Sequence, residues 1–466
     1  MAPAFQFEHA LPFSEDTAAE TLRQLPPSSG ILCLRGPNPT DEPYLTRTAD
    51  LRRRAMRLLA PPELTEGGIP VLSKRLNLRG RVARIEWCAA ASEFEALLVL
   101  YQASAQAFGY AEARRRLRLH TPFCLRFTSE NPHPRVYVTN RLSKRGLAHT
   151  FGPFPSRASA ERYADAMLDL FKLRRCHEDL EPYPEHPGCV YQEMKKCLAP
   201  CNLACTPDEY AAESAAVLAF LETNGESMLT QIAADREQAS ENMDFERAAN
   251  LHQQWTKVKA ATALASELVR EIPKLRAILV QKAVQNSERL EANLFLLEGG
   301  CLTGPERLST LGVRAVKEQT SVGSSLFAQP LMLQAVPLEG EPTPTDSPEE
   351  RAAAALATLE AKAGPERDLP MLSDHLSLVR RWFYRPEKQR IGEIFFPNPD
   401  GNWPVRRILR GAARMALGEP GLMAETNREG VDAAKVKILH EGREGVERVV
   451  PVVSRRRKKP AELPTP

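Results

Sequence analysis

Three features are missing from this 466-residue sequence, and each absence excludes a class of protein. No run of about 18 consecutive apolar residues occurs, so we predict no membrane span. Met1 to Glu15 has no basic stretch followed by an apolar core, so we expect no secretory signal. The 62 Lys and Arg residues barely outnumber the 59 Asp and Glu residues, so any basic surface must be local. We therefore expect a cytoplasmic protein without a membrane partner.

The pattern of apolar residues predicts an α+β protein with roughly two to four domains. Strands are expected at 30–34, 81–89, 123–127, 136–138, 275–280 and 294–297, and helices at 50–59, 93–107, 158–173, 208–222, 226–262 and 351–362. The domains we predict are a small α/β domain at 17–120, a strand and helix segment at 121–207, a helical segment at 208–262, an α/β hairpin region at 270–337, a linker at 338–350, a basic aromatic domain of mixed structure at 351–440 and a basic tail at 441–466.

Nine cysteines divide into two groups. Four are scattered, and we interpret them as buried apolar residues: Cys33, Cys88, Cys124 and Cys301. The other five crowd into one segment: Cys176, Cys189, Cys197, Cys201 and Cys205. Four thiolates can hold zinc or an iron–sulfur cluster. Since CxxC pairs are missing, the spacing leaves zinc, iron–sulfur and metal-free thiols open.

Residues 226–262 contain a break at Asn242-Met243-Asp244 and predict a helical hairpin. Asn242 can end the first helix in a left-handed turn, and Asp244 can cap the second. Met228, Leu229 and Ile232 line one helix, whereas Phe245, Ala248, Ala249, Trp255 and Val258 line the other. The pattern fits an ordinary αα-hairpin as well as a docking module.

Two segments concentrate arginine. Arg52, Arg53 and Arg54 give the helix at 50–59 a basic face, to which Arg47 just before the helix adds; such a face can bind phosphates or simply be solvated. Between 374 and 411, arginines that include Arg381 and Arg385 alternate with aromatic residues. Such a segment either stacks and holds nucleic acid or forms a packed core with a charged rim. We predict that Arg52, Arg53, Arg381 and Arg385 contact DNA.

Several runs together resemble the UvrC nucleotide-excision-repair family. They are the Phe151-Gly152-Pro153-Phe154-Pro155 turn, Arg174-Arg175-Cys176, Cys189-Val190-Tyr191-Gln192, Cys197-Leu198-Ala199-Pro200-Cys201, and the hairpin run from Asn242 to Leu251. The resemblance implies a [4Fe–4S] cluster at Cys176, Cys189, Cys197 and Cys201, with zinc as the alternative metal. It also implies a UVR hairpin that docks on UvrB through Phe245, Glu246, Ala248, Ala249 and Leu251. The family's Arg-Asp pair is His252-Gln253 here.

The same family opens with a GIY-YIG nuclease domain, and the match at 17–120 is partial. Gly30-Ile31-Leu32 stands where GIY is expected, and Tyr44-Leu45-Thr46 stands for YIG. The resemblance assigns catalytic positions to Tyr44, Arg47 and Arg54, but it places Leu100 where the metal-binding glutamate belongs. A leucine cannot ligate Mg²⁺, which takes oxygen ligands. We therefore predict a degenerate site that would use Mg²⁺ only if another residue, such as Glu93 or Glu95, replaced the lost ligand.

Three functions remain open from the sequence. The first is a repair protein that binds DNA, UvrB or both and has impaired or lost nuclease activity. The second is an active excinuclease-type endonuclease that cuts beside lesions. The third is an iron–sulfur protein with a structural or redox-sensing role. The family's second nuclease carries an Asp-Ile-Ser-His stretch, and since none follows residue 262 we expect that centre to be absent.

Overall fold

The computed structural model describes residues 5–61, 76–177, 180–284, 290–311, 313, 347–364, 368–386 and 389–417, together with the backbone of β13 (Val436–Lys437) and β14 (Val449–Val450). Most of the predicted linker at 338–350 and of the basic tail at 441–466 lies outside these residues. The described chain mixes helices with antiparallel sheets, so the fold is α+β, as the sequence predicted.

The N-terminal part is an antiparallel sheet with helices on both faces. Its strands, in the order β1-β4-β2-β3, are β1 (His9–Pro12), β4 (Arg84–Ala89), β2 (Gly30–Arg35) and β3 (Tyr44–Thr48), and its helices are α1 (Ala18–Gln24), α2 (Leu51–Leu58), α3 (Glu93–Phe108) and α4 (Tyr110–Leu117), with a 3-10 turn at Arg79–Arg81. Successive strand residues face opposite sides. Leu32 therefore packs with α1 and α2, whereas its neighbour Ile31 packs with α3.

The middle part is a second antiparallel sheet followed by the cysteine segment and three long helices. The strands, in the order β6-β5-β7-β8, are β6 (Val136–Thr139), β5 (Phe123–Phe127), β7 (Thr150–Phe154) and β8 (Arg270–Glu271), and the helices are α5 (Arg157–Leu168), α6 (Val190–Glu193), α7 (Pro207–Thr223), α8 (Glu226–Glu241) and α9 (Phe245–Thr262), with a 3-10 turn at Pro200–Asn202. The Gly152-Pro153-Phe154 run lies inside β7, paired with β5, where we had expected a turn.

The third sheet joins two segments that we had predicted to be separate domains. Its strands, in the order β11-β10-β9-β12, are β11 (Cys301–Ser309), β10 (Glu291–Glu298), β9 (Arg276–Lys282) and β12 (Glu393–Phe395), and its helices are α10 (Pro348–Lys362), α11 (Leu369–Phe383) and α12 (Val405–Leu417), after a 3-10 turn at Ile272–Lys274. Because β12 pairs with β9, the described parts of the predicted domains at 270–337 and 351–440 share one sheet and one apolar core.

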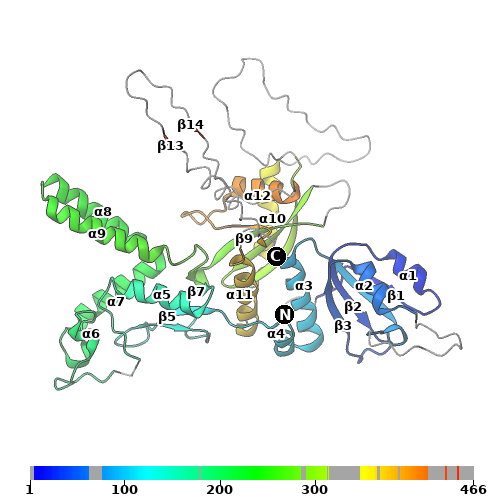
Figure 1. Ribbon diagram of the computed structural model, residues 1–466, viewed down its shortest axis with the longest axis horizontal. Helices are drawn as coiled ribbons and strands as arrows, with labels where there is room; N and C mark the ends of the chain where they lie inside the picture. The colour runs from blue at the N-terminus through cyan, green and yellow to red at the C-terminus, as the bar shows by residue number, and fades with distance from the viewer. Residues whose placement is uncertain are drawn as a thin grey trace, which may run out of the picture.

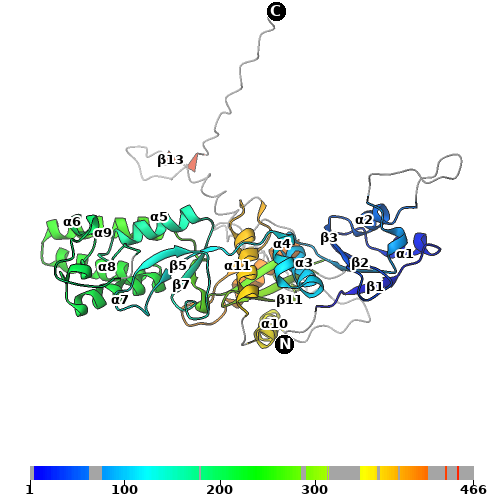
Figure 2. The ribbon, with the colours of Figure 1, turned by 90° about the horizontal axis from the view of Figure 1, so that it is seen from below.

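Helix α11 connects all three parts, as Figures 1 and 2 show by its central place beside α3 and α4. Phe94 of α3 meets Phe295 of β10 at 5.4 Å and Trp382 of α11 at 5.5 Å between ring centroids. Buried Asp374 of α11 accepts hydrogen bonds from Arg114 Nε at 2.7 Å and from the Tyr101 hydroxyl at 3.0 Å. A buried carboxylate is costly unless it is paired, so these two bonds fix the position of α11 against α3 and α4.

Candidate functional site

Tyr44 and Arg54 come together in the structure. Tyr44 begins β3 and Arg54 lies in the middle of α2, whose first turn is capped by Asp50 accepting from the Arg53 N–H at 2.8 Å. The Arg54 Nη2 donates to the Tyr44 hydroxyl at 2.8 Å. The fold therefore brings together two of the three residues that resemble nuclease positions, although they lie on different elements.

Arg47, the third of these residues, is paired with Glu93 at the start of α3. Its Nη1 lies 2.8 Å from Glu93 Oε1. Arg385, which follows α11, donates to both oxygens of the same carboxylate at 2.5 and 2.9 Å. The Arg385 hydrogen bond, helped by Arg47, lowers the pKa of Glu93 to about 2. Glu93 is therefore an ionised carboxylate shared by two guanidinium groups that come from opposite ends of the chain.

Leu100 lies on α3 in an apolar environment. It is half-buried and packs against a cluster that includes Ile31 and Cys88 of the sheet. Phe5 and Phe7 of the N-terminal segment, whose ring centroids are 5.1 Å apart, pack against the same cluster. Leu32, at the position of the first motif tyrosine, is fully buried on the other face of the sheet. Both leucines therefore contribute to packing, and neither offers an oxygen to a cation.

Glu95 is turned toward the third sheet. Its Oε1 accepts from Asn293 Nδ2 of β10 at 2.6 Å, and its Oε2 accepts from the Ala91 N–H at 3.1 Å. Burial raises the pKa of Glu95 to about 7. Among the described residues, neither Glu93 nor Glu95 belongs to a group of three His, Cys, Asp or Glu side chains close enough to share an ion.

The four arginines predicted to contact DNA differ in exposure. Arg52 Nε donates to the Leu25 carbonyl at 2.6 Å, and Arg381 donates to the Leu117 and Arg118 carbonyls at 3.2 and 2.8 Å. Arg385 is engaged by Glu93. Arg53 alone of the four is exposed on its helix. The guanidinium groups of Arg52, Arg381 and Arg385 thus have partners within the protein. DNA contact by any of the four arginines stays a prediction.

The cysteine segment brings Cys176, Cys189, Cys197 and Cys201 into one another's electrostatic range. Burial, with added repulsion from the other three sulfurs, raises the pKa of the Cys197 thiol to about 11. The same factors raise the pKa of Cys201. Four thiolates at such a place repel one another unless a cation neutralises them. The chemistry of the donor set suits a thiolate-ligated metal or cluster, although among the described residues no three of these sulfurs lie within 4.8 Å of one another.

The backbone of this segment is bent at positions that side chains rarely adopt. Lys195, Ala199 and Leu203 have φ of 56°, 55° and 57°, in the left-handed region. Such a conformation costs roughly 1–2 kcal/mol per non-glycine residue. Two of the thiols accept hydrogen bonds: the Ala199 N–H donates to Cys197 Sγ at 3.3 Å, and Arg174 Nη1 donates to Cys176 Sγ at 3.5 Å. Strain gathered around four thiols is consistent with a loop shaped to enclose a bound group.

The predicted helical hairpin is formed by α8 and α9, at the opposite end of the molecule from the first sheet (Figure 1). Leu229, Ile232 and Val258 are buried in it, as we expected. Asp244 caps α9 by accepting from the Arg247 N–H at 3.0 Å, also as expected. The left-handed residue is Met243, with φ of 54°, and not Asn242.

The tip of the hairpin exposes apolar side chains. Met243 is 77% and Phe245 is 70% exposed. Of the other residues predicted to bind a partner, Glu246 and Ala249 are exposed, whereas Ala248 and Leu251 are half-buried. We had expected Phe245 and Ala249 to line the second helix where it faces the first. Both side chains instead face solvent. An exposed apolar tip on a capped hairpin is a typical docking surface.

Comparison with known proteins identifies these two features. Residues 123–220, which include the cysteine segment, match the family described as UvrC/Cho excinuclease, middle domain. Residues 226–261, which form the α8–α9 hairpin, match the UvrB/uvrC motif. The middle domain and the hairpin of this chain are thus similar to those of UvrC proteins. No solved structure matches it.

Three similar curated proteins are each called UvrABC system protein C. That of Carboxydothermus hydrogenoformans is 27% identical over 293 residues, which are 62% of this chain and 45% of the relative. That of Idiomarina loihiensis is 32% identical over 126 residues, 27% of this chain and 20% of the relative. That of Desulforudis audaxviator is 27% identical over 254 residues, 53% of this chain and 38% of the relative. The chain thus spans less than half the length of these relatives.

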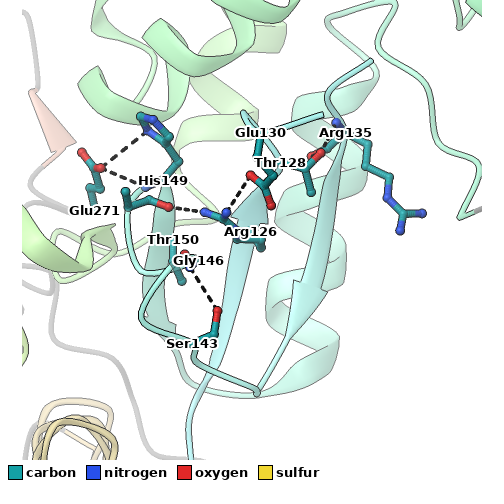
Figure 3. A network of polar contacts seen from close by, with 10 residues as sticks. Arg126, Thr128, Glu130, Arg135, Ser143, Gly146, His149, Thr150 and Glu271 are labelled. Atoms are coloured by element: carbon teal, nitrogen blue, oxygen red, sulfur yellow. Dashed lines mark hydrogen bonds and ion pairs between the residues drawn. The ribbon is translucent and has the colours of Figure 1, made fainter. Parts of the chain in front are cut away.

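One loop that we did not predict to be functional lies at residues 140–149, between β6 and β7 of the middle part. Figure 3 shows its hydrogen bonds, among them those that Arg126 makes to the Ala148 carbonyl and to Glu130. The loop carries Arg141, Lys144 and Arg145, all exposed. The signal that could have identified it is the complete lack of Asp and Glu from 131 to 160.

At the end of this loop, His149, Glu222 and Glu271 bring one ligand atom each within 4.8 Å of the others. Lys274 Nζ already lies 2.8 Å from Glu222 and 2.6 Å from Glu271. One lysine therefore already offsets part of the charge of the two carboxylates. No helix among the described residues is long and apolar enough to cross a membrane.

Proposed function

We propose that this chain is a nucleotide-excision-repair protein of the UvrC type that binds DNA and a UvrB-type partner, and that its N-terminal domain does not cut DNA. The observation that carries the loss of cutting is the packing of Leu100 against the apolar cluster that contains Ile31, Cys88 and Val99. Hydrolysis by a GIY-YIG site depends on a hard cation that neutralises charge developing on the phosphate. An apolar side chain offers that cation no ligand.

The two carboxylates nearest in sequence do not replace the lost ligand. Glu93 binds Arg47 and Arg385, and a cation there would have to displace both guanidinium groups. Glu95 accepts from Asn293, and burial holds its pKa near 7, so it carries only part of a charge at neutral pH. These contacts support the proposal that the N-terminal domain has a structural role.

Docking on a UvrB-type partner is supported by the α8–α9 hairpin. Its apolar tip at Met243 and Phe245 is available without rearrangement, because the buried residues Leu229, Ile232 and Val258 already hold the helices together. A similar hairpin on the partner would bury the same side chains. Burying a side chain the size of phenylalanine stabilises a complex by roughly 1.5–3 kcal/mol.

The four cysteines would hold a [4Fe–4S] cluster in this proposal, with zinc as the alternative. When bound, either would supply a covalent brace for a segment with little regular structure. Iron analysis and visible absorption after anaerobic purification distinguish the two metals. We expect Cys201→Ser to lose both signals and Cys33→Ser, at a buried cysteine in the first sheet, to keep them. A colourless wild-type protein with stoichiometric zinc would contradict the iron assignment.

A second candidate, an active endonuclease, is favoured by one observation, the surviving Tyr44–Arg54 hydrogen bond at 2.8 Å. An incision assay on damaged duplex with and without Mg²⁺, in the presence of a UvrB-type protein, separates the candidates. We expect no Mg²⁺-dependent product. Robust cutting that disappears in Arg54→Ala, but persists in the exposed control Arg57→Ala, would overturn the first proposal. A purely redox or structural protein would show no DNA affinity in a salt titration.

A further inference from the structure

The β6–β7 loop, residues 140–149, concentrates positive charge that the described part of the protein does not neutralise. Arg141, Lys144 and Arg145 are exposed, and no hydrogen bond or ion pair of their side chains is found among the described residues. This contrasts with α4, where Arg115 and Arg116 are both held by Glu112 at 2.6 and 2.7 Å. Since residues 131–160 contain no Asp or Glu, the loop has no acidic neighbour in sequence.

The loop is held in one shape by its own hydrogen bonds. The Arg141 N–H donates to Thr139 Oγ1 at 3.0 Å, which fixes the entry. The Gly146 N–H donates to the Ser143 carbonyl at 3.1 Å and to Ser143 Oγ at 3.0 Å, which closes the turn that carries Lys144 and Arg145. Groups that are already ordered lose less conformational entropy when they bind a ligand.

Two contacts hold the far end of the loop against the sheet. Arg126, which is buried, donates to the Ala148 carbonyl and to Glu130 Oε2, the latter at 2.8 Å (Figure 3). The His149 N–H donates to Glu271 Oε1 at 2.9 Å. The charge of Arg126 is thus used inside the domain, where this arginine supports the loop. The loop's own cations, Arg141, Lys144 and Arg145, remain exposed.

The inward side of the loop is apolar. Leu142 and Leu147 pack against the core that α11 shares with α3 and α4. Because leucines anchor the loop from beneath, its basic side chains stand on a rigid base at the junction of the three parts of the molecule. Long cationic side chains on such a base suit a repeating anion better than a single small ligand.

We propose that Arg141, Lys144 and Arg145 form a contact surface for the phosphate backbone of duplex DNA. The inference rests on the proposed DNA-binding function and assigns it to a particular surface. Such contacts fix the position of the protein on the duplex without reading bases. Each phosphate neutralised by a cation releases counterions, which adds about 0.9 to the slope of log affinity against log salt for duplex DNA.

The test compares full-length variants by fluorescence anisotropy with a labelled duplex over a salt series. We expect Arg141→Gln/Lys144→Gln/Arg145→Gln to bind at least tenfold more weakly near physiological salt. Its salt slope should be smaller by roughly 2 to 3. The matched control is Arg23→Gln/Arg162→Gln/Lys257→Gln, which removes three exposed charges from α1, α5 and α9. Thermal unfolding of all three proteins establishes that they are equally folded.

The outcomes separate the inference from the function on which it rests. A wild-type protein that shows no salt-dependent binding would overturn both. Wild-type binding that the loop variant retains with an unchanged slope would overturn the loop assignment and leave DNA binding standing. An equal loss in the loop variant and the control would show that net charge, and not this surface, determines affinity, which also overturns the assignment.

Discussion

Leu100 occupies the position where family resemblance implies a carboxylate, and it packs against an apolar cluster that includes Ile31 and Val99. At the scale of single residues, this contact turns a possible ligand position into a packing position. The substitution is a prediction from the sequence alone, and it rests on the resemblance of the run Glu95-Ala96-Leu97-Leu98-Val99-Leu100 to the family pattern. The sequence could not predict that Phe5 and Phe7 would pack against the same cluster as Leu100, because they lie far from it in the chain.

We predict that Leu100→Glu lowers the free energy of unfolding by about 1–3 kcal/mol, because it places a carboxylate among apolar side chains. Leu100→Met, which preserves volume and polarity, should cost less than about 1.5 kcal/mol. Urea denaturation measures both. A Leu100→Glu protein as stable as wild type would mean that the packing around this position is looser than described.

Glu95 predicts a pH dependence of stability. Its pKa is raised from 4.5 to about 7 by burial, so the folded state binds more protons than the unfolded state between these values. Stability is therefore full below the unfolded pKa and falls as pH rises through the folded one, by about 3 kcal/mol at most. Glu95→Gln should remove this fall, as urea denaturation at pH 5 and 8 would reveal. A wild-type protein equally stable at both pH values would contradict the assignment.

At the scale of elements, the sequence predicted the helices whose ends carry capping residues. Ser92 caps α3 and Asp50 caps α2, and both helices begin within a residue or two of the expected positions. The helix predicted to reach 173 ends instead at Leu168, because Phe171 and Leu173 leave it to pack into the core with α7. The spacing of apolar residues along the sequence cannot predict that contact, because the contact is a tertiary one.

Strand β11 shows a different limit of sequence reading. Its Gly304-Pro305 pair is typical of a turn, yet both residues lie in the strand, where the pairing with β10 shifts register between Leu294 and Leu296. A bulge of this kind accommodates residues that would interrupt a regular ladder. Similarly, the sequence identified the hairpin and the four cysteines, but not the β6–β7 loop, whose shape depends on the distant residues Arg126 and Glu271.

We predict that Phe245→Ala weakens binding to a UvrB-type partner at least tenfold while leaving the unfolding transition of the protein almost unchanged. The side chain is 70% exposed, so its removal costs little in the free chain and much in an interface that buries it. Isothermal titration with the partner's hairpin measures the first effect. Gln253→Ala, at another exposed position of α9, is the control, and equal losses in both variants would contradict a specific docking tip.

At the scale of the whole molecule, the three sheets are not independent. Phe94 lies on the N-terminal domain, but its aromatic neighbours Phe295 and Trp382 belong to the third sheet and to α11. Arg385 adds an ion pair to Glu93 across the same junction. We predicted separate domains because each part has its own periodic pattern of apolar residues. The core that the parts share is visible only in the folded structure.

We predict that Phe94→Ala destabilises the whole molecule by about 3–5 kcal/mol, since it removes a buried ring from a core shared by all three parts. Calorimetry should show the transition shifted to lower temperature as a unit. Phe5→Ala, at the edge of the first sheet, should cost much less. A Phe94→Ala protein in which only the N-terminal domain melts early would show that the parts fold separately.

The shared core also has an evolutionary consequence. A chain that discarded residues 93–119 would lose one wall of the core around α11 as well as its N-terminal domain. Natural selection for folding is therefore sufficient to retain this domain even in a lineage that has no use for its chemistry. Among organisms that carry this architecture, substitutions should accumulate at Tyr44 and Arg54 while Phe94, Leu98 and Tyr101 remain large and mostly apolar.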